Sequence, residues 1–257
     1  MAQLDGKVAI ITGGGSGVGR AAALMMAAEG AKCVLVGRRM EPLTEVVAEI
    51  KAAGGEATAH SADLCDGDAA AAVADVTLKA YGQIDILVNN AGFSSKIRSV
   101  KYVQPEEWDA VFQVNMNAVY RLTQACLPHM MEKKAGTVVT TSSMSALKPG
   151  VLGGSPYSAA KAASLAFMRA LSSELRDQGI RACTICPAEI DTPILDGRPS
   201  PPDEAARATM MMPEDVAAAM LLCATMPHRT VIDEIVMSPV INRDISAELE
   251  VAMTKSS

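Results

Sequence analysis

The sequence predicts an α/β domain built on a doubly wound parallel sheet with helices on both faces. Apolar strand-like runs alternate with helical segments from the first residues onward. The strand-like runs are almost continuously apolar, which is typical of strands buried on both faces of a sheet. The chain has 257 residues, which is enough to bury the core of one such domain. We therefore expect a single domain over residues 1–257.

Glycines set the boundaries in the first half, because a helix often ends just before a glycine, as expected at Gly30 and Gly54. We expect strands at Lys7–Thr12, Cys33–Val36, Ala57–His60 and Ile84–Val88, and helices at Val18–Glu29, Glu41–Ala53 and Asp68–Tyr81. The second half is expected to hold a long helical stretch at Pro105–Lys134, a strand at Thr137–Thr141, a helix over 156–177, a strand at Ile180–Cys186, a helix at Pro213–Met226 and a last strand at Val231–Met237.

The regular pattern breaks between Pro187 and Pro213, where six of the 13 prolines lie. A helix and a strand still follow, so this stretch is expected to be a substrate loop at about 187–213 rather than a linker. We expect it to be mobile without ligand and ordered over a bound one. The tail after Pro239 is either a partner-docking arm or a frayed end.

Composition restricts the classes of partner. The net charge of −6 argues against a nucleic acid or an anionic membrane surface. Cys183 and Cys186 form a C-x-x-C sequence, but they point to opposite faces of a predicted strand. We therefore expect no metal site, and reduced thiols used as small apolar groups. Together with an N-terminus that has no signal-peptide pattern, these features predict a cytoplasmic protein.

Tyr157 and Lys161 are four residues apart in a predicted helix, so they share one face, one turn apart. A nearby cation favours the phenolate form of tyrosine, whose ordinary pKa is about 10. Such a phenol becomes an acid/base able to work near neutral pH. The alternative is a pair of solvated surface side chains.

The segment Thr12–Gly19 is glycine-rich and joins the first strand to the first helix. Glycines there allow a tight turn and close approach of the backbone to a pyrophosphate, which the helix N-terminus stabilises. A simple connecting turn is the alternative. The other polar candidates also follow strands, at the edge where parallel sheets bind their ligands.

Taken together, these segments resemble the short-chain dehydrogenase/reductase family over roughly residues 5–240. The matching residues are Thr12, Gly13, Gly17, Gly19, Asp63, Leu64, Asn89, Asn90, Ala91, Gly92, Asn115, Ser143, Tyr157, Lys161, Pro187, Thr192 and Pro193. The resemblance implies a Rossmann-type sheet of about seven strands, a nicotinamide cofactor, a small-molecule substrate and a homodimer or homotetramer.

The resemblance also implies a role for each matching residue. Tyr157 would be the general acid in carbonyl reduction and the base in alcohol oxidation. Lys161 would lower the tyrosine pKa and bind the nicotinamide ribose. Ser143 would hold the substrate oxygen, with Ser145 as a nearby alternative, and Asn115 would position a water that links Lys161 to solvent. The cofactor-binding residues would be Gly13, Ser16, Gly17, Val18, Gly19, Arg38, Asp63, Leu64, Asn89, Ala91, Gly92, Tyr157, Lys161, Pro187, Ile190 and Thr192.

The end of the second strand bears on the choice of cofactor. NAD enzymes place an acidic residue there to bind the ribose diol, whereas this chain has Gly37, Arg38 and Arg39. An arginine offers a fork for a 2′-phosphate. NADP(H) is therefore expected rather than NAD(H), unless both arginines are merely solvated.

We expect an oxidoreductase that interconverts a carbonyl and a secondary alcohol. The alternatives are an NAD(H)-dependent enzyme and a dinucleotide-sensing regulatory protein without turnover, which would not need an acid/base. A mostly apolar substrate is expected from the pocket candidates, which are Ser94, Ser145, Leu147, Val151, Leu152, Glu189, Ile194 and Leu195. Glu189 follows Pro187 and Ala188 where the family has Pro-Gly, and it faces either the pocket or solvent.

Overall fold

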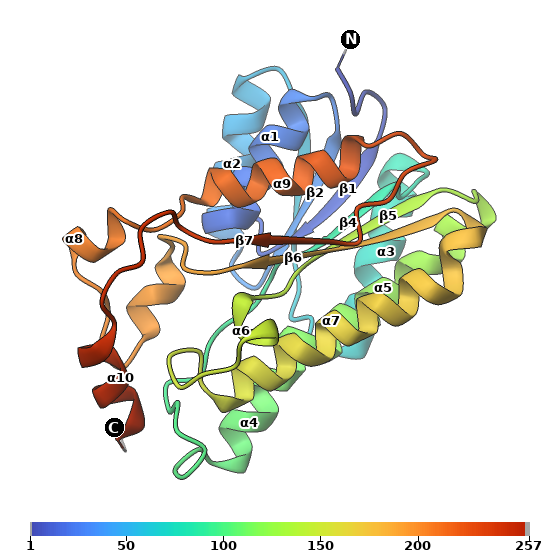
Figure 1. The fold of residues 1–257 in the computed structure, drawn as a ribbon. Coiled ribbons are helices and arrows are strands. Elements are labelled where there is room, and N and C mark those ends of the chain that lie inside the picture. The colour runs from blue at the N-terminus through green and yellow to red at the C-terminus, as the bar shows by residue number, and fades with distance from the viewer. Residues whose placement is uncertain (1, 255–257) are drawn as a thin grey trace.

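A seven-stranded, wholly parallel sheet forms the centre of the molecule (Figure 1), in a computed structural model that describes residues 2–254. The strands are β1 (Val8–Thr12), β2 (Lys32–Gly37), β3 (Glu56–Ser61), β4 (Ile86–Asn89), β5 (Gly136–Thr141), β6 (Ile180–Pro187) and β7 (Glu234–Met237). Their order is β3-β2-β1-β4-β5-β6-β7. The strand order reverses between β1 and β4, which is where sheets of this kind bind ligands. The predicted fold class is confirmed.

Helices cover both faces. They are α1 (Gly17–Ala28), α2 (Met40–Ala52), α3 (Gly67–Tyr81), α4 (Pro105–Phe112), α5 (Ala118–Glu132), α6 (Met144–Leu147), α7 (Ser155–Leu175), α8 (Glu204–Arg207), α9 (Pro213–Thr225) and α10 (Ser246–Met253). One core contains side chains of α1, α2 and α9 with Ile11, and the other contains those of α3, α5 and α7 with Ile10. Neighbouring strand residues thus point to opposite faces, and both faces are buried.

Two predicted elements differ from the structure. The long helical stretch is interrupted by a π-helical turn, Gln113–Asn117, between α4 and α5. The last strand begins at Glu234 rather than Val231, and a side chain holds the turn that comes before residue 231. The Arg181 guanidinium donates hydrogen bonds to the carbonyl oxygens of Met226 (2.5 Å) and Thr230 (3.4 Å).

The expected substrate loop contains a short 3₁₀ turn, Pro193–Gly197, and the helix α8. Ile190 and Met211 pair as an isolated parallel bridge near its two ends. The side chain of Arg207 forms ion pairs with Asp191 (2.9 Å) and Asp196. The backbone bridge and the two ion pairs of Arg207 thus hold the beginning of the loop against its end.

The described part of the tail is not frayed, because it folds back onto the protein's own loop, and the partner-docking arm stays a prediction. Arg243 pairs with Glu189 (2.7 Å), and Glu248 on α10 pairs with Arg198 of the loop (3.2 Å). Arg198 also pairs with Glu189 (2.8 Å), and Arg243 with Glu248. We call these four residues the loop–tail cluster; α10 lies beside the loop in Figure 1. Glu189 therefore contacts two arginines rather than open solvent.

Among residues 2–254, the structure contains no helix long and apolar enough to cross a membrane. All six cysteines are free thiols. Cys183 packs in the core that contains α9, while Cys186 adjoins Ser142 and Ser143 on the other side of β6. This agrees with the expectation that the two thiols lie on opposite faces.

Candidate active site

Hydrogen bonds between strand ends form the base of the site. The Thr12 hydroxyl accepts bonds from the backbone N–H groups of Asn90 (2.9 Å) and Ala91 (3.0 Å). The Asn90 amide donates to the Thr12 carbonyl (3.2 Å), and the Thr141 hydroxyl donates to the Asn90 amide oxygen (3.2 Å). These bonds join the carboxyl ends of β1, β4 and β5, so the motif residues of three strands meet at one edge.

The glycine-rich turn brings α1 against the end of β1. Gly13 has φ +68° and Gly17 has φ +50°. These angles lie in the left-handed region, which glycine adopts without steric strain. A Cβ on Gly19 would overlap the carbonyl oxygen of Gly13 and lie 2.7 Å from the Asn90 amide nitrogen. The sequence requires glycine here so that the first turn of α1 can approach the backbone of the preceding turn.

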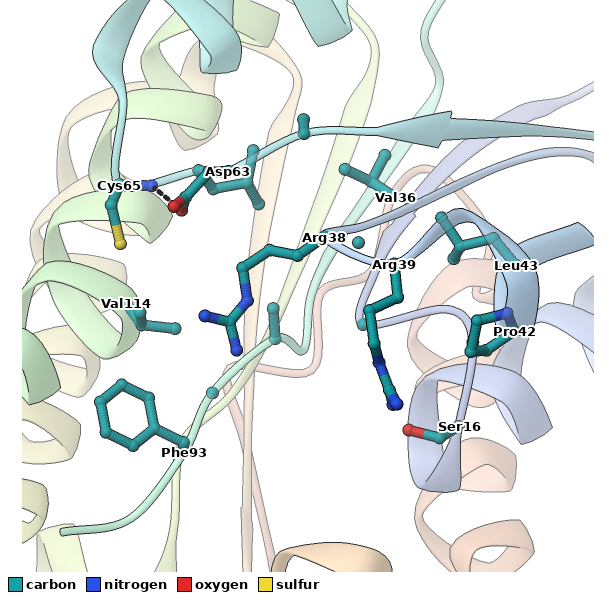
Figure 2. Close-up of a pocket in the computed structure, with 17 residues that line it drawn as sticks. Ser16, Val36, Arg38, Arg39, Pro42, Leu43, Asp63, Cys65, Phe93 and Val114 are labelled. Atoms are coloured by element: carbon teal, nitrogen blue, oxygen red, sulfur yellow. Dashed lines mark hydrogen bonds between the residues drawn. The ribbon is translucent and has the colours of Figure 1, made fainter.

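A cavity of about 450 Å³ lies beyond this turn (Figure 2). Its lining includes seven of the expected cofactor residues, namely Gly13, Ser16, Arg38, Asp63, Leu64, Ala91 and Gly92. The Arg38 side chain extends into the middle of the cavity toward Val114 and Phe93, and Arg39 extends toward Ser16. Arg39, Cys65, Phe93 and Val114 line the cavity without having been selected from the sequence. Only Arg39 had a sequence signal, as the second arginine after β2.

The other expected cofactor residues lie around this cavity or behind it. Val18 is buried in the core, and Ile190 packs against the same core. The Thr192 methyl group lies 3.3 Å from the position of a Cβ on Gly17, so the substrate loop contacts the glycine-rich turn. Pro187 ends β6.

The Asn89 side chain does not reach the cavity. It is buried, and its amide nitrogen donates to the Thr123 hydroxyl of α5 (3.0 Å). Residues alternate between the faces of a strand, and Asn89 falls on the face covered by α5. The structure therefore does not support a side-chain contact between Asn89 and a ligand.

The π-helical turn positions Asn115. Its amide nitrogen donates to the carbonyl oxygens of Phe93 and Val111, both at 2.9 Å, which fixes the orientation of the amide. Its buried amide oxygen has no hydrogen-bond partner among the described residues. A Cβ on Gly92 would lie 2.6 Å from that oxygen and 3.4 Å from the Lys161 Nζ atom. Gly92 is therefore small so that the Asn115 amide oxygen and the Lys161 ammonium can come close together. An unpaired buried acceptor beside an ammonium is a suitable place for a water.

Tyr157 and Lys161 lie together on α7 as predicted. The Lys161 ammonium is buried, donates to the Thr141 carbonyl oxygen (2.7 Å) and lies 5.6 Å from the centroid of the Tyr157 ring. Burial lowers the pKa of Lys161 to about 8. A charged ammonium is costly in this position, because the low-dielectric surroundings disfavour the charged form.

The pKa of Tyr157 differs from the expectation. Burial raises it above its ordinary value, while a hydrogen bond with Ser143 and the charges of Arg98 and Arg198 oppose this increase. The phenol is therefore protonated at neutral pH in this structure.

The structure places Ser143, rather than Ser145, beside the tyrosine. Ser143 is the N-cap of α6, and its hydroxyl accepts a bond from the Ser145 backbone N–H (3.1 Å) while it also contacts Tyr157. The Ser145 hydroxyl instead lies near Gly153, 2.5 Å from the position of a Cβ there. The catalytic candidates Asn115, Ser143, Tyr157 and Lys161 are thus brought together.

Arg98 is a residue near Tyr157 that sequence reasoning missed. It lies in the segment after β4, and its Nη1 donates to the carbonyl oxygens of Leu152 (2.6 Å) and Gly153 (2.9 Å). No local pattern marks it, because its partners are more than 50 positions away. No group of three or more metal-ligating side chains exists among residues 2–254.

Comparison with known proteins gives consistent matches. The family model described as short chain dehydrogenase matches residues 7–202. A 3-oxoacyl-[acyl-carrier-protein] reductase of Thermotoga maritima is 32% identical over 228 residues, covering 87% of this chain and 92% of that protein. A metagenomic short-chain oxidoreductase, solved in complex with NADP, is 34% identical with a TM-score of 0.81, covering 93% of this chain and all of that one. Levodione reductase is 30% identical with a TM-score of 0.83, covering 91% and 96%.

Proposed function

The chain belongs to the short-chain dehydrogenase/reductase family of oxidoreductases, and we propose that it transfers hydride between NADP(H) and a carbonyl or secondary alcohol substrate. The observation that carries this proposal is the convergence of Ser143, Tyr157, Lys161 and the unpaired Asn115 oxygen at the edge of the sheet. An acid/base of this kind has no use in a protein that only binds a dinucleotide.

The cavity residues fit a nicotinamide dinucleotide. The close approach at Gly19 leaves the N-terminal turn of α1 free to face a pyrophosphate. Gly37 ends β2 without an acidic side chain, and Arg38 and Arg39 both enter the cavity. Two guanidinium groups suit a 2′-phosphate, which favours NADP(H). The metagenomic relative was solved with NADP, which supports the same choice.

The bound cofactor would supply or accept the hydride. This chain's residues would handle the proton and the substrate oxygen. Ser143 and Tyr157 would bind that oxygen, and the Tyr157 hydroxyl would donate its proton to it during reduction. The raised pKa of Tyr157 keeps this proton in place at neutral pH. Lys161 would contact the cofactor ribose, and Asn115 would hold a water beside it for proton resupply.

Tyr157→Phe tests the chemistry, because it keeps the ring and removes only the proton donor. We expect kcat on a panel of ketones and aldehydes to fall at least about 10²-fold, with the NADPH dissociation constant nearly unchanged. Turnover is read from the loss of NADPH absorbance, and binding from its fluorescence. Phe167→Leu, an aromatic change elsewhere on α7, is the control for helix packing. Normal turnover by Tyr157→Phe would remove the tyrosine from the mechanism.

Cofactor choice is tested separately. We expect kcat/KM with NADPH to exceed that with NADH at least about tenfold, since a charge-assisted hydrogen bond contributes about 1.5–3 kcal/mol. Arg38→Ala should remove most of this preference, and adding Gly37→Asp should reverse it. Arg229→Ala, an exposed arginine remote from the cavity lining, is the control. Equal use of both cofactors by the unmodified protein would favour the NAD(H) alternative, and binding without turnover on any carbonyl would favour a sensor.

We also propose that the protein works as a homodimer or homotetramer in the cytoplasm. Family membership supports the oligomer. The six free thiols support a reducing compartment.

A further inference from the structure

Arg98 is a buried cation without an anion. Its side chain is only 3% exposed, its Nε has no hydrogen-bond partner, and no carboxylate within residues 2–254 lies at ion-pair distance from it. A guanidinium has five N–H donors, and the two bonds to Leu152 and Gly153 occupy only Nη1. Burying a charge without a paired charge is costly. Anchoring this loop would not require a charged group.

Arg98 lies at the start of α7, the helix that carries Tyr157. The loop residues that it holds, Leu152 and Gly153, lead directly into α7, which carries Tyr157. Gly153 in turn lies against Ser145, two residues from Ser143. The charge of Arg98 also acts on the Tyr157 hydroxyl, as its effect on the tyrosine pKa indicates. The Arg98 carbonyl oxygen also accepts a hydrogen bond from the Ser155 N–H (3.1 Å), and a Cβ on Gly154 would lie 2.9 Å from the Arg98 Cδ atom, so this cation lies against the first turn of the helix that carries Tyr157.

A second arginine shares the same small cavity. The cavity has a volume of about 10 Å³, and its lining residues are Arg98, Leu152, Arg198, Pro199, Ser200, Glu248 and Ala252. It thus lies between the segment after β4, the substrate loop and α10. A volume of this size holds about one water, so residues 198–200 must shift outward to admit a larger group.

The charged residues that line this cavity are Arg98, Arg198 and Glu248. Within the loop–tail cluster, Arg198 and Arg243 balance Glu189 and Glu248. Each carboxylate of the cluster already accepts bonds from both arginines, so Glu248 is neutralised although it lines the cavity. Arg98 forms no ion pair among residues 2–254; the nearby Glu107 acts on its charge, but the carboxylate of Glu107 accepts bonds from the backbone N–H groups of Lys96 and Ile97. The site as a whole therefore favours an anion.

We propose that the substrate is an oxo acid, with Arg98 and Arg198 binding its carboxylate while its carbonyl lies at Ser143 and Tyr157. This rests on the proposed oxidoreductase function and replaces the mostly apolar substrate expected from the sequence. In the reduction, hydride from NADPH adds to the carbonyl carbon and the Tyr157 hydroxyl gives its proton to the oxygen. The products are a hydroxy acid and NADP⁺, and the carboxylate is unchanged.

Matched acid and ester pairs test the proposal with the unmodified protein. We would measure kcat/KM with NADPH for 2-oxo, 3-oxo and 4-oxo acids of four to six carbons and for their methyl esters. At least one acid should exceed its own ester by about tenfold or more, because the ester keeps the shape and loses the charge. Esters that are reduced as well as, or better than, their acids in every pair would overturn the proposal.

A binding measurement separates this proposal from the activity itself. With NADP⁺ present, butyrate and succinate should raise the melting temperature, and butyramide and succinamide should not. Carboxylate binding without turnover of any carbonyl would contradict the oxidoreductase function alone. Reduction of neutral ketones without carboxylate binding would contradict the oxo-acid proposal alone, and absence of binding by the carboxylates counts against it in either case.

Arginine variants locate the carboxylate. Arg98→Met should lower the acid-to-ester ratio of kcat/KM at least about tenfold, and Arg98→Lys should restore part of it, since lysine keeps the charge and loses the fork. Arg198→Gln should lower the ratio as well, which keeps the test decisive if Arg98→Met fails to fold. Arg229→Met is the matched control. Equal loss on acid and ester in both the Arg98→Met and the Arg198→Gln variants would show that the arginines only support the loop.

Discussion

Lys161 is buried where an ammonium group is least stable. Its pKa is lowered to about 8, and the difference from 10.5 corresponds to about 3 kcal/mol against the charged form. The hydrogen bond to the Thr141 carbonyl satisfies one of the three N–H donors of the ammonium. A residue that costs stability while facing the proposed ribose site is typical of a site selected for function.

Removing this charge should therefore stabilise the protein without cofactor. Lys161→Met is expected to raise the melting temperature at pH 7 by about 2–6 °C and to abolish turnover. Below pH 8 the lysine is charged in both the folded and unfolded chains, so the burial cost is present in full. Between pH 8 and 10.5 the folded protein binds fewer protons than the unfolded chain, so the unmodified protein gains stability and the advantage of the variant shrinks.

Thermal unfolding of both proteins from pH 7 to 9.5 tests whether the stability advantage of Lys161→Met shrinks as the pH rises. Lys148→Met, at an exposed position, should show no such pH-dependent difference. A constant difference between Lys161→Met and the unmodified protein across this range would mean that Lys161 does not lose its proton there.

The junction of β1 and α1 depends on one position. In Gly19→Ala the added methyl group would overlap the Gly13 carbonyl, and the neighbouring atom is backbone that cannot rotate away. We expect a loss of about 1–3 kcal/mol in the free energy of unfolding, as for other overpacked sites, and at least tenfold weaker NADPH binding. Chemical denaturation and NADPH fluorescence measure the two effects. Gly150→Ala, where a Cβ would meet nothing within 4 Å, should change neither.

The loop–tail cluster connects α10 to the substrate loop. Arg243→Gln removes the hydrogen bonds to Glu189 that hold the tail against the loop, and the bond to Glu248 within the tail. We expect faster proteolysis within residues 192–212 and a KM for the carbonyl substrate raised at least about threefold, with NADPH affinity kept. Arg229→Gln serves as the control. Protection of the loop by NADP(H) in the unmodified protein is also expected, and cleavage mapping elsewhere would show that this segment is not a lid.

The features that could be predicted from the sequence depend on residues that are close together in the chain. The glycine-rich turn, the Tyr157–Lys161 spacing and the alternation of strands and helices each depend on neighbouring residues, and the structure contains all of them. Arg98 depends on a loop more than 50 positions away, and Glu189 depends on Arg243 in the tail. The Tyr157 pKa depends on burial by the whole fold, which spacing along one helix does not reveal.

The sheet as a whole ends in an edge that is well suited to self-association. Within residues 2–254, β7 pairs only with β6 and lies at one end of the strand order, as Figure 1 shows. Val236 on this strand is 54% exposed, and Val240 and Ile241 beyond it are 102% and 60% exposed. An exposed apolar edge with free backbone hydrogen-bonding groups pairs readily with another chain. The proposed homodimer or homotetramer would cover it by placing a second copy against β7.

We expect light scattering after size exclusion to give the mass of two or four chains for the unmodified protein. Val236→Lys should reduce that mass, because a charged side chain on an edge strand opposes pairing. Val76→Lys, an equally drastic change on the exposed side of α3, should leave the mass unchanged. A monomeric unmodified protein would contradict the oligomer, while an unchanged assembly in Val236→Lys would move the interface away from β7. β7 leads into the tail that carries Arg243 and Glu248. If assembly stabilises the loop–tail cluster, a Val236→Lys protein that has lost its partner chains should also have a higher KM for the carbonyl substrate.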